Sequence, residues 1–158
     1  MDECDIIVTR KEKIEPIHQN KHEPYEYYKY QVTQRGHMNE CTVAVFEIPP
    51  GKSNYPFHYH MKEEEVFYII SGRGRLETVS GEREVGAGDI IVCPTTKNAA
   101  HKLTNASDTE KLVYIDFDTA HYPEVVYYPH SGKVGITGSE GENEFFRRDS
   151  RTDYYDGE

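Results

Sequence analysis

The chain has 158 residues and a formal net charge of −10, with 36% apolar and 29% charged residues. This length predicts a single domain with one core, and the negative charge disfavours nucleic acid and anionic membranes as partners. No run approaches the roughly 18 apolar residues of a membrane span, and no basic segment precedes an apolar one near the N-terminus. The three cysteines are an odd, widely spaced set that favours a reducing compartment. We therefore expect a cytoplasmic protein that binds neither nucleic acid nor membrane.

Residues 1–40 are charged, rich in tyrosine and weakly periodic. Short strands are expected over Asp5–Thr9 and Tyr25–Gln31, because both runs are rich in β-branched or aromatic residues. We expect this segment to form an arm that packs on the outside of the core.

Residues 41–118 alternate short strand-like runs with turn signals. The runs are CTVAVFEI, EEVFYIIS, RLETV, EREV, DIIVC and KLVYIDFD. The first five runs end at Gly, Pro or Ser turn signals and the last follows the turn residues 105–108, which predicts an all-β sandwich or barrel. No stretch shows helical periodicity over three turns.

Residues 119–158 form a C-terminal tail with its own turns. A free acidic tail rarely carries many aromatic side chains, so we expect this one to dock on the barrel or at a dimer interface. Its aromatic residues are Tyr122, Tyr127, Tyr128, Phe145, Phe146, Tyr154 and Tyr155.

One run in the middle of the chain carries metal-ligand chemistry. His58 and His60 point to the same face of a strand because side chains two residues apart share a face. Glu65 begins the next strand-like run, which can fold back beside the first, and His101 can join from elsewhere. Three imidazoles and one carboxylate suit divalent iron, manganese, nickel, zinc or copper. The alternative to a metal site is that His58 and His60 lie on a solvated strand and Glu65 forms an ordinary ion pair.

The spacing of these residues resembles the two motifs of the cupin superfamily. Gly51, the HYH run, Glu65 after four further residues and Gly72 after six more match the first motif. The second motif is matched by a set with one departure: Thr96 replaces a glycine, and two extra residues precede the histidine. This second set is Gly88, Pro94, His101 and Asn105.

The resemblance implies a double-stranded β-helix, or jelly-roll barrel, that holds one divalent metal on His58, His60, Glu65 and His101. It also implies a homodimer. The rest of the chain resembles single-domain bacterial cupins of the conserved-barrel type, mostly of unassigned function, some of which are assigned as sugar-phosphate isomerases.

Two functions follow as expectations. The first is a small-molecule metalloenzyme of isomerase, dioxygenase or decarboxylase type that acts on a polar, oxygen-rich substrate such as a sugar derivative. The second is a non-catalytic module that binds a small ligand or a metal, because no general acid or base is evident beyond the ligands.

Several neighbouring residues admit two interpretations. Phe67 and Ile69 share the face of Glu65, so they either form a pocket wall or pack in the core. Phe57 and Tyr59 face away from the two histidines and are expected to pack. Glu63 and Glu64 either lie on a solvated turn or supply, from one of them, a general base near the metal. Asn105 is expected to form hydrogen bonds at a turn rather than to bind metal.

Overall fold

The computed structural model describes residues 6–33 and 40–158 and consists of antiparallel sheets joined by turns. The described residues also form three single-turn 3-10 helices: η1 (Lys11–Lys13) before the first strand, η2 (Lys97–Ala99) between strands, and η3 (Arg148–Ser150) after the last. None of its helices is long and apolar enough to cross a membrane. The expectation of an all-β protein is confirmed.

The largest sheet has six strands in the order β1-β2-β3-β10-β5-β8. They are β1 (Ile17–His22), β2 (Tyr25–Gln31), β3 (Cys41–Ile48), β10 (Leu112–Thr119), β5 (Glu65–Ser71) and β8 (Ile90–Cys93). A three-stranded sheet of β6 (Arg73–Thr78), β7 (Gly81–Gly86) and β9 (His101–Asn105) has the order β7-β6-β9. The remaining sheet has the order β13-β12-β11-β4.

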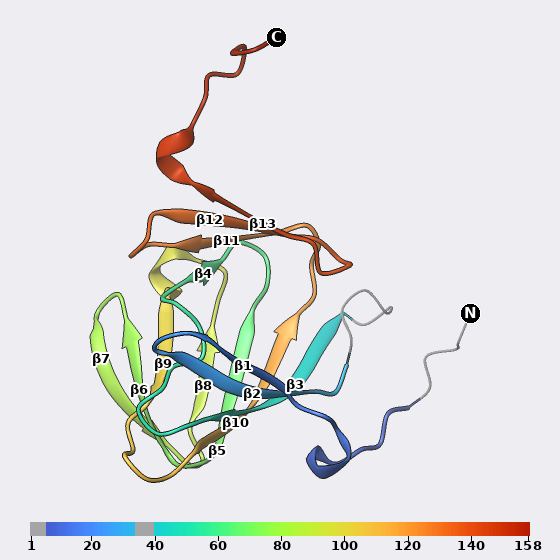
Figure 1. Cartoon of the computed structure of the whole chain (residues 1–158), viewed down its shortest axis with the longest axis vertical. Helices are drawn as coiled ribbons and strands as arrows, with labels where there is room; N and C mark the ends of the chain where they lie inside the picture. Colours follow the sequence, from blue (N-terminus) through green and yellow to red (C-terminus); the bar gives the residue numbers. More distant parts are fainter. Residues whose placement is uncertain (1–5, 34–39) are drawn as a thin grey trace.

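This last sheet lies across one end of the barrel (Figure 1). It joins β4 (Tyr59–His60) to three strands of the tail: β11 (Glu124–Tyr128), β12 (Lys133–Thr137) and β13 (Asn143–Arg147). The pairing is set by Val126 opposite His60 and Tyr127 opposite Tyr59. The tail thus docks on the barrel beside the strand that carries the predicted ligands.

The core forms because alternate residues of the central strands point inward. Ala44, Phe46 and Ile48 of β3 are buried, and the ring of Phe46 stacks on that of Tyr114 with centroids 5.0 Å apart. Removal of such aromatic area from water is the main stabilising contribution, at about 25 cal/mol for each Å².

The two expected strands of the N-terminal segment have different outcomes. The run Tyr25–Gln31 is β2, and it pairs with β3 at the edge of the six-stranded sheet. The expectation of a strand over Asp5–Thr9 is wrong for residues 6–9, which have no regular structure, and Asp5 lies outside the described residues. The polar run 17–22, which lacks a strand-like pattern, forms β1 by pairing with β2.

Candidate metal centre

Backbone pairing brings two of the predicted ligands side by side. The amide of His58 donates to the carbonyl of His101 at 3.1 Å, and the amide of His101 donates back to that of His58 at 2.9 Å. Glu65 is the first residue of β5 and lies opposite Asp118 of β10. Glu65 and His101 stand on strands, and His58 is fixed to β9 by an isolated β-bridge immediately before β4, so backbone pairing holds all three in place.

Three of the four predicted ligands meet in a buried cluster. Ligand atoms of His58, Glu65 and His101 all lie within 4.8 Å of one another. The Nε2 atoms of His58 and His101 lie 3.8 Å and 3.2 Å from the two carboxylate oxygens of Glu65. Ligand atoms held about 2.1 Å from one metal ion lie about 3 to 4 Å apart, so the cluster has the dimensions of a mononuclear site.

His60 lies at the edge of this cluster. Its Nε2 atom is 3.6 Å from Oε1 of Glu65, although His60 is not part of the tight group of three within the described chain. Its Nδ1 atom lies 3.5 Å from Glu124 and 3.7 Å from Glu63. That His60 is the fourth metal ligand stays a prediction, and its Nε2 atom is the nitrogen that faces Glu65.

Backbone carbonyls fix the orientation of the other two imidazoles. Nδ1 of His58 lies 2.8 Å from the carbonyl of Pro56, and Nδ1 of His101 lies 3.0 Å from that of Ala99. Each Nδ1 can donate its proton to the carbonyl, which leaves the lone pair of Nε2 facing Glu65. This arrangement is typical of histidines that bind a metal.

The donor atoms fit a divalent metal ion. Nε2 of His101 and Oε2 of Glu65 are buried and have no hydrogen-bond partner among the described residues. Burial favours the neutral carboxyl, but the three surrounding histidines hold the pKa of Glu65 well below its usual range. A buried carboxylate among imidazole nitrogens offers both the charge and the open lone pairs that a transition metal requires.

Two buried carboxylates lie near His60. Of the two positions that the sequence allows for Glu63, the solvated turn is wrong: Glu63 is buried beside His60, whereas Glu64 is exposed. Glu124, at the start of β11, is fully buried and accepts hydrogen bonds from the amides of Met61 and Lys62 at 2.7 Å and 3.2 Å. Burial opposes the charge of His60, but Glu124 and Glu65 raise the pKa of its imidazole to about 10. The docked tail supplies the covering that the sequence pattern could not show.

A cavity of about 440 Å³ opens beside the cluster. Its walls include His58, His60 and Glu65, together with two further acids of β10, Asp116 and Asp118. Two cations, Lys29 of β2 and Lys133 of β12, line it, as do Thr137, Asn143 and Phe145 of the tail strands. This volume lies within the range of small-molecule sites.

Asp116 and Asp118 add acid–base groups that the sequence interpretation lacked. Burial and the charges of neighbouring acids raise the pKa of Asp116 well above its usual range, and they also raise the pKa of Asp118. Thr42 donates to Asp118 at 3.2 Å. The alternating pattern of the IDFD run places both acids on the inner face of β10, so periodicity could have identified them.

Of the two interpretations of Phe67 and Ile69, the structure supports core packing and not a pocket wall. Both are buried in the core cluster with Phe46 and Tyr114, and neither lines the cavity. They share the face of Glu65 but lie further along β5, where the barrel interior is filled with side chains. The ring of Phe67 does contact His101 edge-on, at a centroid distance of 5.6 Å.

The second motif keeps its ligand despite the two extra residues. They are accommodated in a segment that contains η2, whose first turn is capped by Thr96 where the motif has glycine. Asn105 forms hydrogen bonds as expected: its side-chain amide donates to the carbonyls of Ile48 and Glu110, both at 2.8 Å. Cys93 is buried in the core and is not part of the ligand group.

The sequence matches a family described as Cupin domain over residues 44–118. This span contains both motifs and the entire ligand cluster. Residues 44–118 therefore form a cupin domain. A curated relative, the oxalate-binding protein of Thermotoga maritima, is 31% identical over 74 residues; these are 47% of this chain and 59% of that protein.

Solved cupin structures share the fold over most of the chain. A structure from Silicibacter pomeroyi described as a sugar phosphate isomerase has a TM-score of 0.76 and 20% identity, over 92% of this chain and 95% of that one. A structure from Acidithiobacillus ferrooxidans has a TM-score of 0.77 and 21% identity, over 93% of this chain and 95% of that one. The structure of a predicted oxalate decarboxylase from Thermotoga maritima has a TM-score of 0.60 and 20% identity, over 73% of this chain and 100% of that one. At these identities the likeness establishes the fold alone.

Proposed function

We propose that this cupin is a metal-dependent enzyme that acts on a hydroxyl-rich small molecule, with sugar derivatives as the substrate class and isomerisation as the reaction. The observation that carries the proposal is the shared cavity, in which His58, Glu65 and the acid pair Asp116 and Asp118 face one space. A simple binding module does not need proton-transfer groups beside its ligands.

The cavity residues divide into binding and proton-transfer groups. Lys29 and Lys133 supply positive charge for an anionic group of the substrate, and Thr137 and Asn143 offer hydrogen bonds to hydroxyls. A bound divalent metal would polarise a carbonyl or hydroxyl oxygen of the substrate. Asp116 or Asp118, as the carboxylate, would take a proton from the hydroxyl-bearing carbon beside the carbonyl and return it to the former carbonyl carbon, while the hydroxyl proton passes to the former carbonyl oxygen.

A second candidate is a non-catalytic module that binds a dicarboxylate. The 31% identity to an oxalate-binding protein favours it. The cavity is rich in carboxylates, which disfavours a small dianion unless a metal and the two lysines offset their charge. The two candidates therefore differ in whether a carbon-bound proton is exchanged.

The test is exchange of carbon-bound protons in heavy water. We expect metal-loaded protein to incorporate deuterium into one member of a panel of aldose and ketose phosphates, followed by proton NMR. Of the two variants Asp116→Asn and Asp118→Asn, the one that removes the base should lower the rate by at least about 100-fold, because general-base catalysis contributes that much. Asp108→Asn, a matched change at an exposed loop residue, should leave the rate unchanged. Absence of exchange with every sugar, together with stoichiometric oxalate binding, would favour the binding module.

A further inference from the structure

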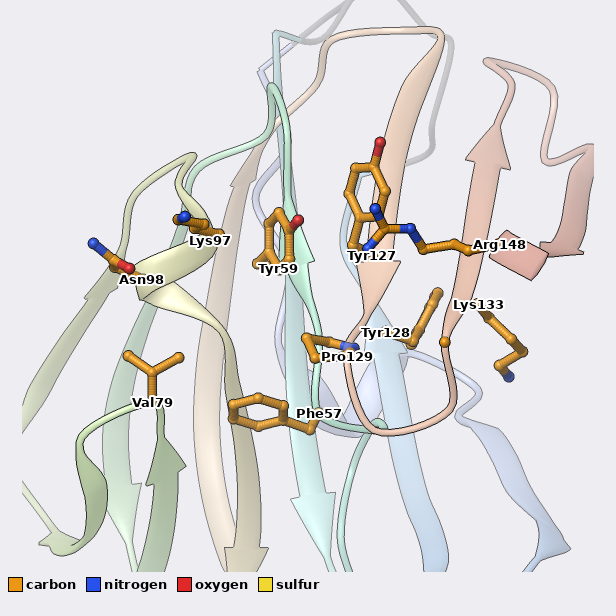
Figure 2. A pocket seen from close by; sticks show the side chains of 11 residues that line it. Phe57, Tyr59, Val79, Lys97, Asn98, Tyr127, Tyr128, Pro129, Lys133 and Arg148 are labelled. Atoms are coloured by element: carbon orange, nitrogen blue, oxygen red, sulfur yellow. The ribbon is translucent and has the colours of Figure 1, made fainter. Parts of the chain in front are cut away.

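A second groove lies on the other side of the ligand-bearing strand. Phe57 and Tyr59 alternate with His58 and His60, and the alternation turns them away from the metal cluster, as the sequence predicts. They line a separate groove of about 320 Å³ rather than only packing against the core (Figure 2). The tail residues Tyr127 and Arg148 border it, as does Lys97 of η2.

Flat aromatic surfaces form one part of this groove. The rings of Tyr59 and Tyr127 stack with centroids 5.1 Å apart and an interplanar angle of 15°. Phe57 is buried and stacks on His130 at 4.5 Å. The stack covers one face of each ring, but both tyrosines are only half-buried, so ring surface outside the stack and the phenolic hydroxyls can meet a ligand.

The charge in the groove has the opposite sign to that of the whole chain. The chain carries 28 acidic and 18 basic residues, yet no residue that lines the groove is acidic. Within the described ranges, neither Lys97 nor Arg148 has a carboxylate within 4.0 Å in a salt bridge. The guanidinium of Arg148 instead lies 5.3 Å from the ring centroid of Tyr127 (Figure 2). An anion in the groove would therefore meet Lys97 and Arg148 without competition from a salt-bridged carboxylate among the described residues.

Arg148 is held in place by its backbone. Its amide donates to the carbonyl of Gly132 at 2.9 Å, which joins the end of β13 to the turn between β11 and β12. A planar guanidinium can donate two parallel hydrogen bonds to a phosphate, which a lysine cannot reproduce. A phosphate in front of Arg148 would leave the attached ring beside the tyrosine surface.

We propose that this outer groove is a second binding site, for a small aromatic anion of the mononucleotide class: a planar ring for the tyrosines and a phosphate for Arg148 and Lys97. The site goes beyond the proposed enzyme function, since it contains none of the metal-cluster residues. Tyr128 and Lys133 line both cavities, and the ring of Tyr128 lies 6.0 Å from that of His58. The groove and the metal centre therefore share a wall.

The test is calorimetric titration of the full chain with adenosine 5′-monophosphate. Adenosine, ribose 5-phosphate and inorganic phosphate serve as partial ligands that carry only the ring or only the phosphate. We expect the nucleotide to bind at least about tenfold more tightly than any of the three, because one charge-assisted hydrogen bond or one stacked ring is worth that factor. Equal binding of ribose 5-phosphate and the nucleotide would overturn the proposal, since the ring would then contribute nothing.

Variants locate the bound nucleotide. Arg148→Gln and Tyr59→Leu should each weaken its binding by about tenfold. The matched control Arg147→Gln changes an exposed neighbour that does not line the groove, and it should bind like the unaltered protein. Thermal unfolding of each variant shows whether it is folded. Binding that survives Arg148→Gln but is lost in Asp116→Asn would place the nucleotide in the inner cavity and contradict the proposal, as would no binding at all.

Discussion

Gly72 shows at the scale of one residue why the first motif ends in glycine. Its φ of +88° is a left-handed conformation that side chains disfavour, and a Cβ atom there would overlap the backbone carbonyl of Lys111. The residue joins β5 to β6 and lies where the chain passes close to the start of β10. The motif glycine therefore serves the closure of the barrel, not the chemistry of the metal.

We predict that Gly72→Ala destabilises the fold by at least about 2 kcal/mol, the sum of backbone strain and steric overlap. Gly88→Ala is the matched control, because its φ of +92° is similar but a Cβ atom meets nothing within 4 Å. Urea unfolding of both variants measures the difference. Equal losses of stability in the two variants would show that the overlap at Gly72 is relieved at no cost.

The spacing of residues in the sequence predicts which side chains are ligands, but it does not predict which residues surround them. Strand alternation and motif spacing are local properties, so His58, Glu65 and His101 could be found without a structure. Glu63 looked like part of a solvated turn because the residue that shields its neighbourhood, Glu124, lies about 60 positions later in the chain. Burial produced by a distant segment leaves no trace in a local pattern.

At the scale of elements, the N-terminal segment is tied to the barrel by a buried carboxylate. Glu47 of β3 binds Lys11 of η1 at 2.5 Å and Lys111 before β10 at 2.7 Å. Burial opposes the charge of Glu47, but the hydrogen bonds from the two lysines hold its pKa below the ordinary value of 4.5. Three segments far apart in sequence thus meet at one side chain.

This lowered pKa predicts a pH-dependent contribution to stability. A carboxyl whose pKa is lower in the folded state stabilises the fold above its unfolded pKa, and the effect is lost as the pH falls through the folded value. Glu47→Gln should cost about 1 kcal/mol at pH 7, a modest value because both lysines are partly exposed to solvent. Chemical unfolding at pH 7 and at pH 3 checks this. A loss that is the same at both pH values would contradict the ion-pair explanation.

The strands that the sequence pattern does not predict are those that form only by pairing with another strand. The run Tyr25–Gln31 has an aromatic, strand-like composition and was predicted, whereas Ile17–His22 is polar and forms β1 only through its pairing with β2. Likewise, the sequence identifies the residues of β9 only as part of a ligand motif, although they alternate between buried and half-buried in the structure. Pairing partners are non-local, so composition alone does not show them.

At the scale of the whole molecule, one face of the six-stranded sheet is apolar and exposed. Tyr68 and Ile70 of β5 and Ile90 and Val92 of β8 are between 44% and 67% exposed, and Tyr68 lies opposite Ile90. An uncharged face allows two copies, each with a net charge of −10, to meet without opposing like charges there. The homodimer stays a prediction, and this face is where we expect it.

Sedimentation velocity tests this prediction directly. The unaltered chain should sediment as a dimer, and Val92→Glu should sediment as a monomer, because a buried unpaired charge costs several kcal/mol. Val79→Glu is the control, since Val79 is 56% exposed but lies in the turn between β6 and β7. If the unaltered chain sediments as a monomer, this face is not a dimer interface and the prediction is wrong.

The ligands of the metal centre come from segments far apart in the chain, and only the closed barrel brings them together. The most direct test is elemental analysis by mass spectrometry of purified protein, beside His101→Ala and the control His22→Ala, an exposed histidine of β1. We predict about one divalent transition metal per chain in the unaltered protein and in His22→Ala, with at least a tenfold loss in His101→Ala, as expected when a ligand is removed. Metal that is absent from all three after reconstitution, or that stays in His101→Ala, would contradict the account.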